Sequence, residues 1–227
     1  MDRPLDAVRP AALDADGPDE GRTARKRRAI LTAATEVFLQ HGYLGASMDE
    51  VAAKASVSKQ TVYKQFADKE HLFAEIILGT RAHVVDGLAS AFAETVDDAA
   101  DVREALRDLA RRLLDGLLQP DVLRLRRLVL AEADRFPEIS AAWFEVSFHR
   151  SLVVLGEAMT RLVGDGLLRE LSDPTLAAYQ FAGLVMYKPM NQAMFAGTEA
   201  RLDPAELDHI ADQAAAVFMA AYGRGSS

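Results

Sequence analysis

Apolar and polar residues alternate with helical period along nearly the whole chain. From Arg22 onward, apolar side chains recur three and four positions apart, the spacing typical of amphipathic α-helices. Strand-type alternation and a βαβ rhythm are missing. The longest unbroken apolar run, 214–222, is far shorter than the roughly 20 residues that a membrane-spanning helix needs. The pattern therefore predicts an all-α protein that makes no contact with a membrane.

The first helices are short and carry their own start and stop signals. A helix is expected over about 23–40, with Gly42 as its stop. Ser47 opens a second helix in a Ser-x-x-Glu capping box with Glu50, Ser58 caps a third over 59–65, and Asp68 caps a fourth. Two helices of about two turns each, joined by a short turn, are typical of a helix-turn-helix.

Longer helices follow and predict a larger bundle. The expected ranges are 101–118, 121–136, 140–163, 173–195 and 203–222. The fourth of these is expected to be broken or kinked at Pro189. Asp-Pro pairs at 173–174 and 203–204 fit the preferred residues of a helix start.

Charge divides the chain into three parts. Residues 1–21 carry two basic and six acidic side chains, residues 22–80 nine and six, and residues 81–227 fifteen and twenty-two. We expect a flexible acidic tail over 1–21, a helix-turn-helix domain over 22–80 and a helical bundle over 81–227. The basic middle part, within a chain of net charge −8, is suited to a polyanionic partner.

Composition and motifs disfavour an enzyme, the main alternative from another functional class. The chain has no cysteine, which excludes disulfides, thiol nucleophiles and zinc–thiolate sites. Nucleophile-elbow, dinucleotide-binding, P-loop and His-Glu-x-x-His motifs are missing, and the five histidines are scattered. We expect no catalytic residues, no cofactor and no metal site. The N-terminus lacks a secretory signal, so a cytoplasmic protein is expected.

The third helix divides its polar and apolar residues as a DNA-reading helix does. Val62 and Phe66 lie four positions apart and face the core, so the polar side chains must face outward. Hydrogen-bonding groups in front of an apolar anchor suit the major groove. Base edges are the expected partners of Lys59, Gln60 and Thr61, and phosphates the expected partners of Tyr63 and Lys64.

Cations also stand at helix starts, where the helix dipole disfavours them. Lys69 follows the fourth cap, and a basic cluster that includes Arg25 and Arg28 begins the first helix. A bound phosphate would compensate these charges. Alone, such a cluster is more often a solvated surface; the co-occurrence of these features in order over about fifty residues favours DNA binding.

The residues that carry these features closely resemble the DNA-binding domain of TetR-family transcriptional regulators. The match covers about 22–80 and includes the motifs at 30–43 (Ile-Leu-x-Ala-Ala-x-x-Val-Phe-x-x-x-Gly-Tyr), 47–55 and 57–73. Ser56 departs from it, since the family often has glycine in that turn. The resemblance implies a homodimer on a two-fold symmetric double-stranded DNA operator. The DNA contacts implied or inferred are Ser47, Lys59, Gln60, Thr61, Tyr63, Lys64, Lys69, Arg25 and Arg28.

The C-terminal part is similar to the AefR-like subgroup, on the run 127–139 with Trp143 and Phe144. Such domains dimerise and enclose an effector pocket. The last two helices are the expected dimer contacts, through Ala214, Ala215, Ala220 and Ala221 with Val217 and Phe218. An apolar or aromatic small molecule is the expected effector, with candidate ligand-binding residues Trp143, Phe144, Phe148, Tyr187, Met190 and Asn191.

The resemblance implies repression that the effector relieves, with the fourth helix as the lever between the two domains. Activation is the alternative sign of regulation. A helix-turn-helix regulator controlled by a protein partner, without a small-molecule pocket, is the alternative mechanism.

Overall fold

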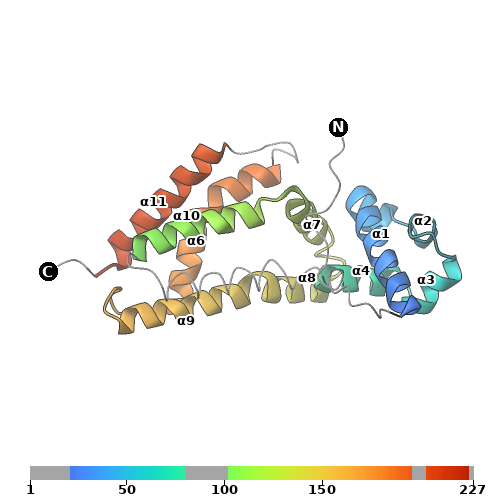
Figure 1. Ribbon diagram of the computed structural model, residues 1–227, viewed down its shortest axis with the longest axis horizontal. Coiled ribbons are helices and arrows are strands. Elements are labelled where there is room, and N and C mark those ends of the chain that lie inside the picture. The colour runs from blue at the N-terminus through green and yellow to red at the C-terminus, as the bar shows by residue number, and fades with distance from the viewer. Residues whose placement is uncertain (1–20, 80–101, 196–202, 225–227) are drawn as a thin grey trace. The chain divides into compact units, whose positions relative to one another are not determined.

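The computed structural model describes residues 21–79, 102–195 and 203–224 (Figure 1). Its contacts divide the chain into two units. The first unit comprises Met1–His83 and Arg124–Phe144, and the second comprises Val84–Leu123 and Glu145–Ser227. Among the described residues there is no strand, only one isolated bridge between Leu168 and Gly223. The predicted all-α fold is confirmed.

The first unit begins with four helices. They are α1 (Arg22–Gly45), α2 (Met48–Lys54), α3 (Lys59–Gln65) and α4 (Lys69–Gly79). Gly42 adopts φ 68°, in the left-handed region that glycine enters without strain, and it kinks α1. The helix expected to stop at Gly42 continues beyond this kink to Gly45. The rest of this unit comes from farther along the chain: most of α7 (Pro120–Ala131) and α8 (Pro137–Phe144), which packs against α4.

Side-chain caps begin the short helices, as predicted. Ser47 Oγ accepts a hydrogen bond from the Glu50 N–H at 3.1 Å, and Ser58 Oγ accepts one from the Thr61 N–H at 3.1 Å. The second half of the capping box was predicted wrongly. The Glu50 carboxylate pairs with His41 Nε2 at 2.9 Å instead of returning to its own helix start, because His41 at the end of α1 offers it a partner.

An aromatic cluster joins the two sequence segments of the first unit. The ring of Tyr43 lies 5.1 Å from that of Phe73 and 4.6 Å from that of Phe136, and Phe38 also contacts Phe73. Burial, with the nearby charges of Glu70 and Asp68, raises the pKa of the Tyr43 phenol above its usual 10. Tyr43 is therefore a neutral packing residue between α1, α4 and the turn that precedes α8.

The second unit is a bundle of long helices around one apolar core. Its described helices are α6 (Val102–Leu117), α9 (Arg150–Gly164), α10 (Pro174–Phe195) and α11 (Pro204–Tyr222). Helix α6 packs on α11, and α9 packs on α10. Leu106, Met159, Phe181 and Phe218 are almost completely buried in the core between them. Arg107–Asp212 and Arg111–Asp208 ion pairs, at 2.8 and 2.7 Å, border the contact between α6 and α11.

Two predicted helices differ from the structure. The helix expected over 121–136 ends at Ala131, because the next amides bond to carbonyls three residues back and form tight turns. The helix expected over 140–163 is not continuous: a π-helical turn, Glu145–His149, separates α8 from α9. Helices α10 and α11 begin one residue after their predicted starts and end at the predicted residues. The predicted break at Pro189 is absent, because α10 continues through this buried proline.

The predicted domain borders stay predictions. Residues 1–20, which make up almost all of the expected tail, and 80–101, which contain the border at 80/81, lie outside the described residues. The inclusion of Arg124–Phe144 in the first unit was not foreseen from the sequence. Within the described ranges, no helix is both long enough and apolar enough to cross a lipid bilayer.

Candidate DNA-binding interface

Helices α2 and α3 are held in place by apolar side chains on their inner faces. Val62 and Phe66 are buried, as are Met48, Val51 and Ala52 of α2. Arg27 of α1 places its guanidinium 4.6 Å from the centre of the Phe66 ring and pairs with Glu75 of α4. These contacts fix the inner face of α3, so that its outer face is presented on a rigid base.

The turn between α2 and α3 carries backbone strain at Ser56. This residue adopts φ 54°, a left-handed conformation that costs a non-glycine residue roughly 1–2 kcal/mol. The Ser56 and Val57 amides bond to Ala53 and Ala52 carbonyls at 3.1 and 3.0 Å, which keeps the turn tight. Serine thus forms this turn in a conformation that glycine would adopt without strain.

The polar side chains of α3 lie on the outside, as the sequence predicts. Lys59, Gln60, Tyr63 and Lys64 are exposed, and the Tyr63 side chain is 44% accessible although it is a large aromatic residue. Thr61 is half-buried, and its hydroxyl lies 2.8 Å from Ser58 Oγ. An exposed amide, phenol and two ammonium groups on one short helix provide donors for phosphates and base edges.

Asp49 is a neighbour of this surface that sequence reasoning missed. Its Oδ1 lies 2.7 Å from Lys59 Nζ, and the hydrogen bond to this carboxylate raises the pKa of Lys59 above its usual 10.5. The ammonium also lies 6.0 Å from the centre of the Tyr63 ring. The helical spacing of α2 alone could not reveal this pair, because it depends on the crossing of α2 and α3.

Lys69 has partners within the protein. Its Nζ donates to the carbonyls of Tyr43 and Ala46, at 2.7 and 2.9 Å, and lies 4.5 Å from the centre of the Tyr43 ring. These acceptors at the end of α1 explain a cation at the start of α4 without an anion. The phosphate contact expected of Lys69 stays a prediction.

The remaining candidate DNA contacts, Ser47, Arg25 and Arg28, belong to the same unit. Ser47 is exposed, with its hydroxyl oxygen accepting from Glu50; Arg25 is exposed and Arg28 half-buried on the first turns of α1. No DNA is present, so the role of all nine candidate residues as DNA contacts stays a prediction.

The candidate ligand-binding residues do not gather in one described unit. Trp143 and Phe144 belong to the first unit, while Phe148, Tyr187, Met190 and Asn191 belong to the second. Tyr187 is 77% exposed, and Asn191, also exposed, donates to the Tyr187 carbonyl at 2.6 Å. The sequence did not single out one polar pair: His149 Nδ1, at the end of the π-helical turn, lies 2.9 Å from the Tyr179 hydroxyl of α10.

Family comparisons agree with this geometry. Residues 30–76 match the model of bacterial regulatory proteins of the tetR family, and residues 104–224 match that of the C-terminal domain of AefR-like transcriptional repressors. The second match alone spans 121 of the 227 residues, more than half of the chain. The chain belongs to the TetR family. The resemblance inferred from its motifs is confirmed, in both its N-terminal and its C-terminal part.

Solved structures extend the likeness over most of this TetR-family chain. One, described as a TetR-family transcriptional regulator from Mesorhizobium loti MAFF303099, is 43% identical, covers 90% of this chain and 100% of its own, and superposes with a TM-score of 0.83. A flavonoid-responsive regulator, FrrA, is 26% identical over 89% of this chain and 99% of its own, with a TM-score of 0.68.

A relative of established name matches a shorter stretch. The transcriptional activator FasR of Mycolicibacterium smegmatis is 36% identical over 81 residues, which are 36% of this chain and 37% of FasR. The alignment thus covers little more than a third of FasR. Relatives of this TetR-family protein are DNA-binding transcriptional regulators, and FasR shows that they include activators.

Proposed function

We propose that this protein is a homodimeric repressor that binds a two-fold symmetric DNA operator and releases it when an apolar or aromatic small molecule binds. The proposal that the protein binds DNA rests on one observation, the division of buried and exposed side chains on α3. Its buried Val62 and Phe66 leave Lys59, Gln60, Tyr63 and Lys64 exposed together on a fixed base. One such helix from each protomer would enter successive major grooves, about 34–36 Å apart.

Exposed apolar side chains on α10 and α11 support the dimer. Leu184, Tyr187 and Phe195 of α10 are exposed, with Phe195 at 87%, and so is Val217 of α11. Burying such side chains against a second copy is favourable at about 25 cal/mol per Å² of apolar area. Part of the original expectation was wrong: Ala214, Ala215 and Phe218 are buried within the chain's own core, so the outer residues Val217, Ala220 and Ala221 remain for the dimer.

The effector would bind among the C-terminal helices. Phe148 and Met190 are half-buried and offer adaptable apolar surface, whereas Tyr187 and Asn191 lie on the outside. Trp143 and Phe144 lie just before the π-helical turn, so a ligand that reorders this turn would affect both sides of it. FrrA, by its description, responds to flavonoids, which are aromatic; this relative supports an aromatic class of effector.

The effector's signal has a physical route to α4. Helix α8 packs against α4, and Phe136, just before α8, contacts Tyr43 and Phe73. The same chain continues through the π-helical turn into α9 of the second unit. An effector that binds the DNA-incompetent conformation more tightly would shift α8, and α8 would move α4 and the attached helix-turn-helix.

The test is a binding shift with the DNA upstream of the protein's own gene. A Tyr63→Ala, Lys64→Ala double variant should bind about 10- to 100-fold more weakly at about 0.1 M salt, since phosphate contacts are lost in both protomers. Arg112→Ala, which removes an exposed cation from α6, is the matched control and should bind as the wild type does. Equal binding by the double variant would contradict the assignment of the α3 surface.

A further inference from the structure

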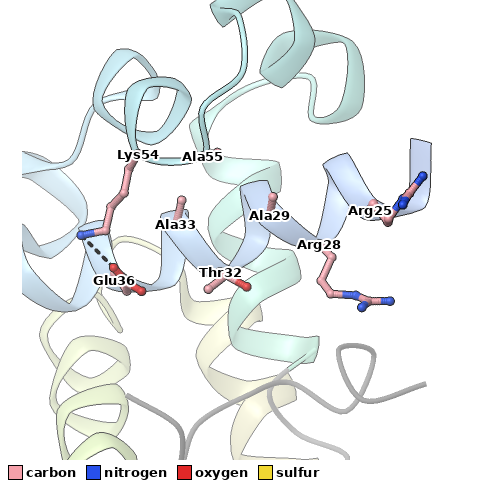
Figure 2. Close-up of a pocket in the computed structure, with 8 residues that line it drawn as sticks. All are labelled: Arg25, Arg28, Ala29, Thr32, Ala33, Glu36, Lys54 and Ala55. Carbon is pink, nitrogen blue, oxygen red and sulfur yellow. Dashed lines mark ion pairs between the residues drawn. The ribbon is translucent and has the colours of Figure 1, made fainter. Parts of the chain in front are cut away.

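A groove with cationic ends runs along the outer face of α1. Its volume is about 470 Å³ and its walls come from α1 and from the end of α2 (Figure 2). Arg25 and Arg28 lie toward the start of α1, and Lys54 lies at the far end, where its Nζ is 2.7 Å from Glu36 Oε2. Small side chains line the space between these ends: Ala29, Thr32, Ala33 and Ala55.

Cationic side chains outnumber acidic ones in the lining of the groove. Arg25, Arg28 and Lys54 line it, with one carboxylate, that of Glu36. No acidic residue stands in the first turn of α1, and its N-cap, Gly21, provides no side-chain hydrogen bond. The lining is therefore suited to an anionic segment without bulky side chains, since the alanines leave room for a backbone to approach.

The chain carries such a segment immediately before α1 in its sequence. Residues 1–20 lie outside the described residues, and their sequence holds six acidic and two basic side chains. Between Asp14 and Gly21 stands a Gly17-Pro18 pair, which is typical of a chain reversal. Seven residues reach at most about 23 Å when extended. Arg28, seven residues into the helix, lies only about 10 Å along its axis from Gly21.

We propose that the acidic segment 1–20 docks into this groove and competes with DNA for Arg25 and Arg28, so that the chain limits its own affinity for DNA. Asp14 and Asp16 are the principal contacts, because a short tether gives them a high effective concentration at these arginines. The competition with DNA rests on the proposed function, while the docking itself does not.

The first experiment compares two variants of equal charge in the full chain. Asp14→Asn, Asp16→Asn should bind DNA about three- to tenfold tighter than the wild type at about 0.05 M salt, since each exposed ion pair contributes only a little. The difference should disappear at about 0.3 M salt, where exposed charges are screened. The control, Asp2→Asn, Asp6→Asn, removes the same charge farther from α1 and should change the affinity much less.

Substitutions in the groove separate docking from general repulsion between the acidic segment and DNA. Lys54→Gln removes a cation from the groove, so it should weaken docking of the acidic segment and tighten DNA binding. Glu36→Gln removes the carboxylate, so it should strengthen docking and weaken DNA binding. Neither residue is among the predicted DNA contacts, so both changes should have no effect in the Asp14→Asn, Asp16→Asn background. Equal effects of the two aspartate pairs, or an unchanged response to the groove variants, would overturn the proposal.

A measurement without DNA tests the docking alone. The chain has no cysteine, so Ala15→Cys provides a unique site for a nitroxide label. The label should broaden the methyl resonances of Ala29 and Ala33 at low salt and lose this effect at high salt. Absence of broadening at low salt would overturn the docking, even if the protein binds its DNA. Broadening in a protein that binds no DNA would support the docking and contradict the proposed function instead.

Discussion

The two units are stabilised in different ways. In the first, short helices begin at serine and aspartate caps, turns are tight, and aromatic rings from α1, α4 and the segment before α8 form the packing contacts. In the second, the long helices that the structure describes share one continuous apolar core, and ion pairs lie at its borders. The first unit thus depends more on local geometry, and the second on the mutual fit of distant helices.

This contrast corresponds to the two tasks that we propose. A DNA-reading surface needs a few side chains in fixed positions, which short capped helices on a rigid base provide. A ligand-responsive bundle needs two packings of similar free energy, and long helices that slide or bend supply them. The π-helical turn, Glu145–His149, begins the second of the two segments that form the second unit, and π-helical turns are frequent at functional sites.

The largest expected effect comes from removing one core ring from each unit. Phe73 and Phe218 are both almost completely buried, with edge-on partner rings 5.3 and 5.4 Å away. Replacement by alanine should cost about 3–5 kcal/mol at either position. Trp143, the single tryptophan, belongs to the first unit, so its fluorescence reports that unit while circular dichroism reports all helices.

If the units are independent, Phe73→Ala lowers the midpoint of the fluorescence transition, and Phe218→Ala lowers only that of the circular dichroism transition. A common shift of both signals by either variant would show that the two units unfold together. The units would then differ in their local packing but not in their stability.

A smaller effect tests the close packing of the second unit. A Cβ at Gly156 would lie 3.0 Å from the backbone of Pro174 and Thr175, so Gly156→Ala must push α9 and α10 apart. We expect a loss of about 1–3 kcal/mol in the free energy of unfolding. Gly116→Ala in α6 is the control: its Cβ meets open space, and a gain of about 0.5–1 kcal/mol is expected from helix propensity. Urea unfolding followed by circular dichroism measures both, and a Gly156→Ala protein as stable as the wild type would show that the two helices pack less tightly.

Local signals of the first unit should have effects of about 1 kcal/mol. Ser58→Ala removes the cap of α3 and should destabilise the unit by about that amount. Ser56→Gly should stabilise it by up to about 1 kcal/mol, because glycine relieves the left-handed strain at φ 54°. Trp143 fluorescence in urea checks both. Destabilisation by Ser56→Gly would mean that the serine side chain contributes more than the strain costs.

The smallest expected effect is a pH dependence at the start of α4. Asp68 Oδ1 accepts hydrogen bonds from the backbone and Nδ1 of His71, at 2.8 and 2.9 Å. The bond to Asp68 raises the pKa of His71 above 6.5, and the bonds from His71 lower the pKa of Asp68. The histidine contribution to stability is complete below about pH 6.5 and disappears as pH rises through the raised pKa.

Asp68 contributes in the opposite sense: its stabilisation is present above about pH 4 and disappears as pH falls through the lowered pKa. An Asp68→Asn variant should return the His71 pKa toward 6.5, as measured by the titration of its ring protons. His71→Gln is the matched control and should remove the loss of stability on the alkaline side. An unchanged His71 pKa in Asp68→Asn would show that the pair does not form in solution.

Much of the fold was predictable because its signals are local. Ser47, Ser58 and Asp68 cap helices within three residues of themselves, and Gly42 interrupts α1 through its own φ. The outer surface of α3 was predictable too, since Val62 and Phe66 orient the helix by spacing alone. The partners of the basic side chains were not predictable. Lys59 pairs with Asp49 of α2, and Lys69 of α4 donates to carbonyls at the end of α1 and just after it.

The sequence by itself determined most of the helices, the serine and aspartate caps that begin them, the apolar anchors of the DNA-reading helix and the family. Each of these depends on residues close together in the chain or on a continuous motif. Tertiary structure alone decided which side of α11 is buried, how Arg124–Phe144 joins the first unit, and where the helix expected over 140–163 changes to a π-helical turn. Those features depend on contacts between residues that are distant in sequence, and helical periodicity marks an apolar face without naming the partner that covers it.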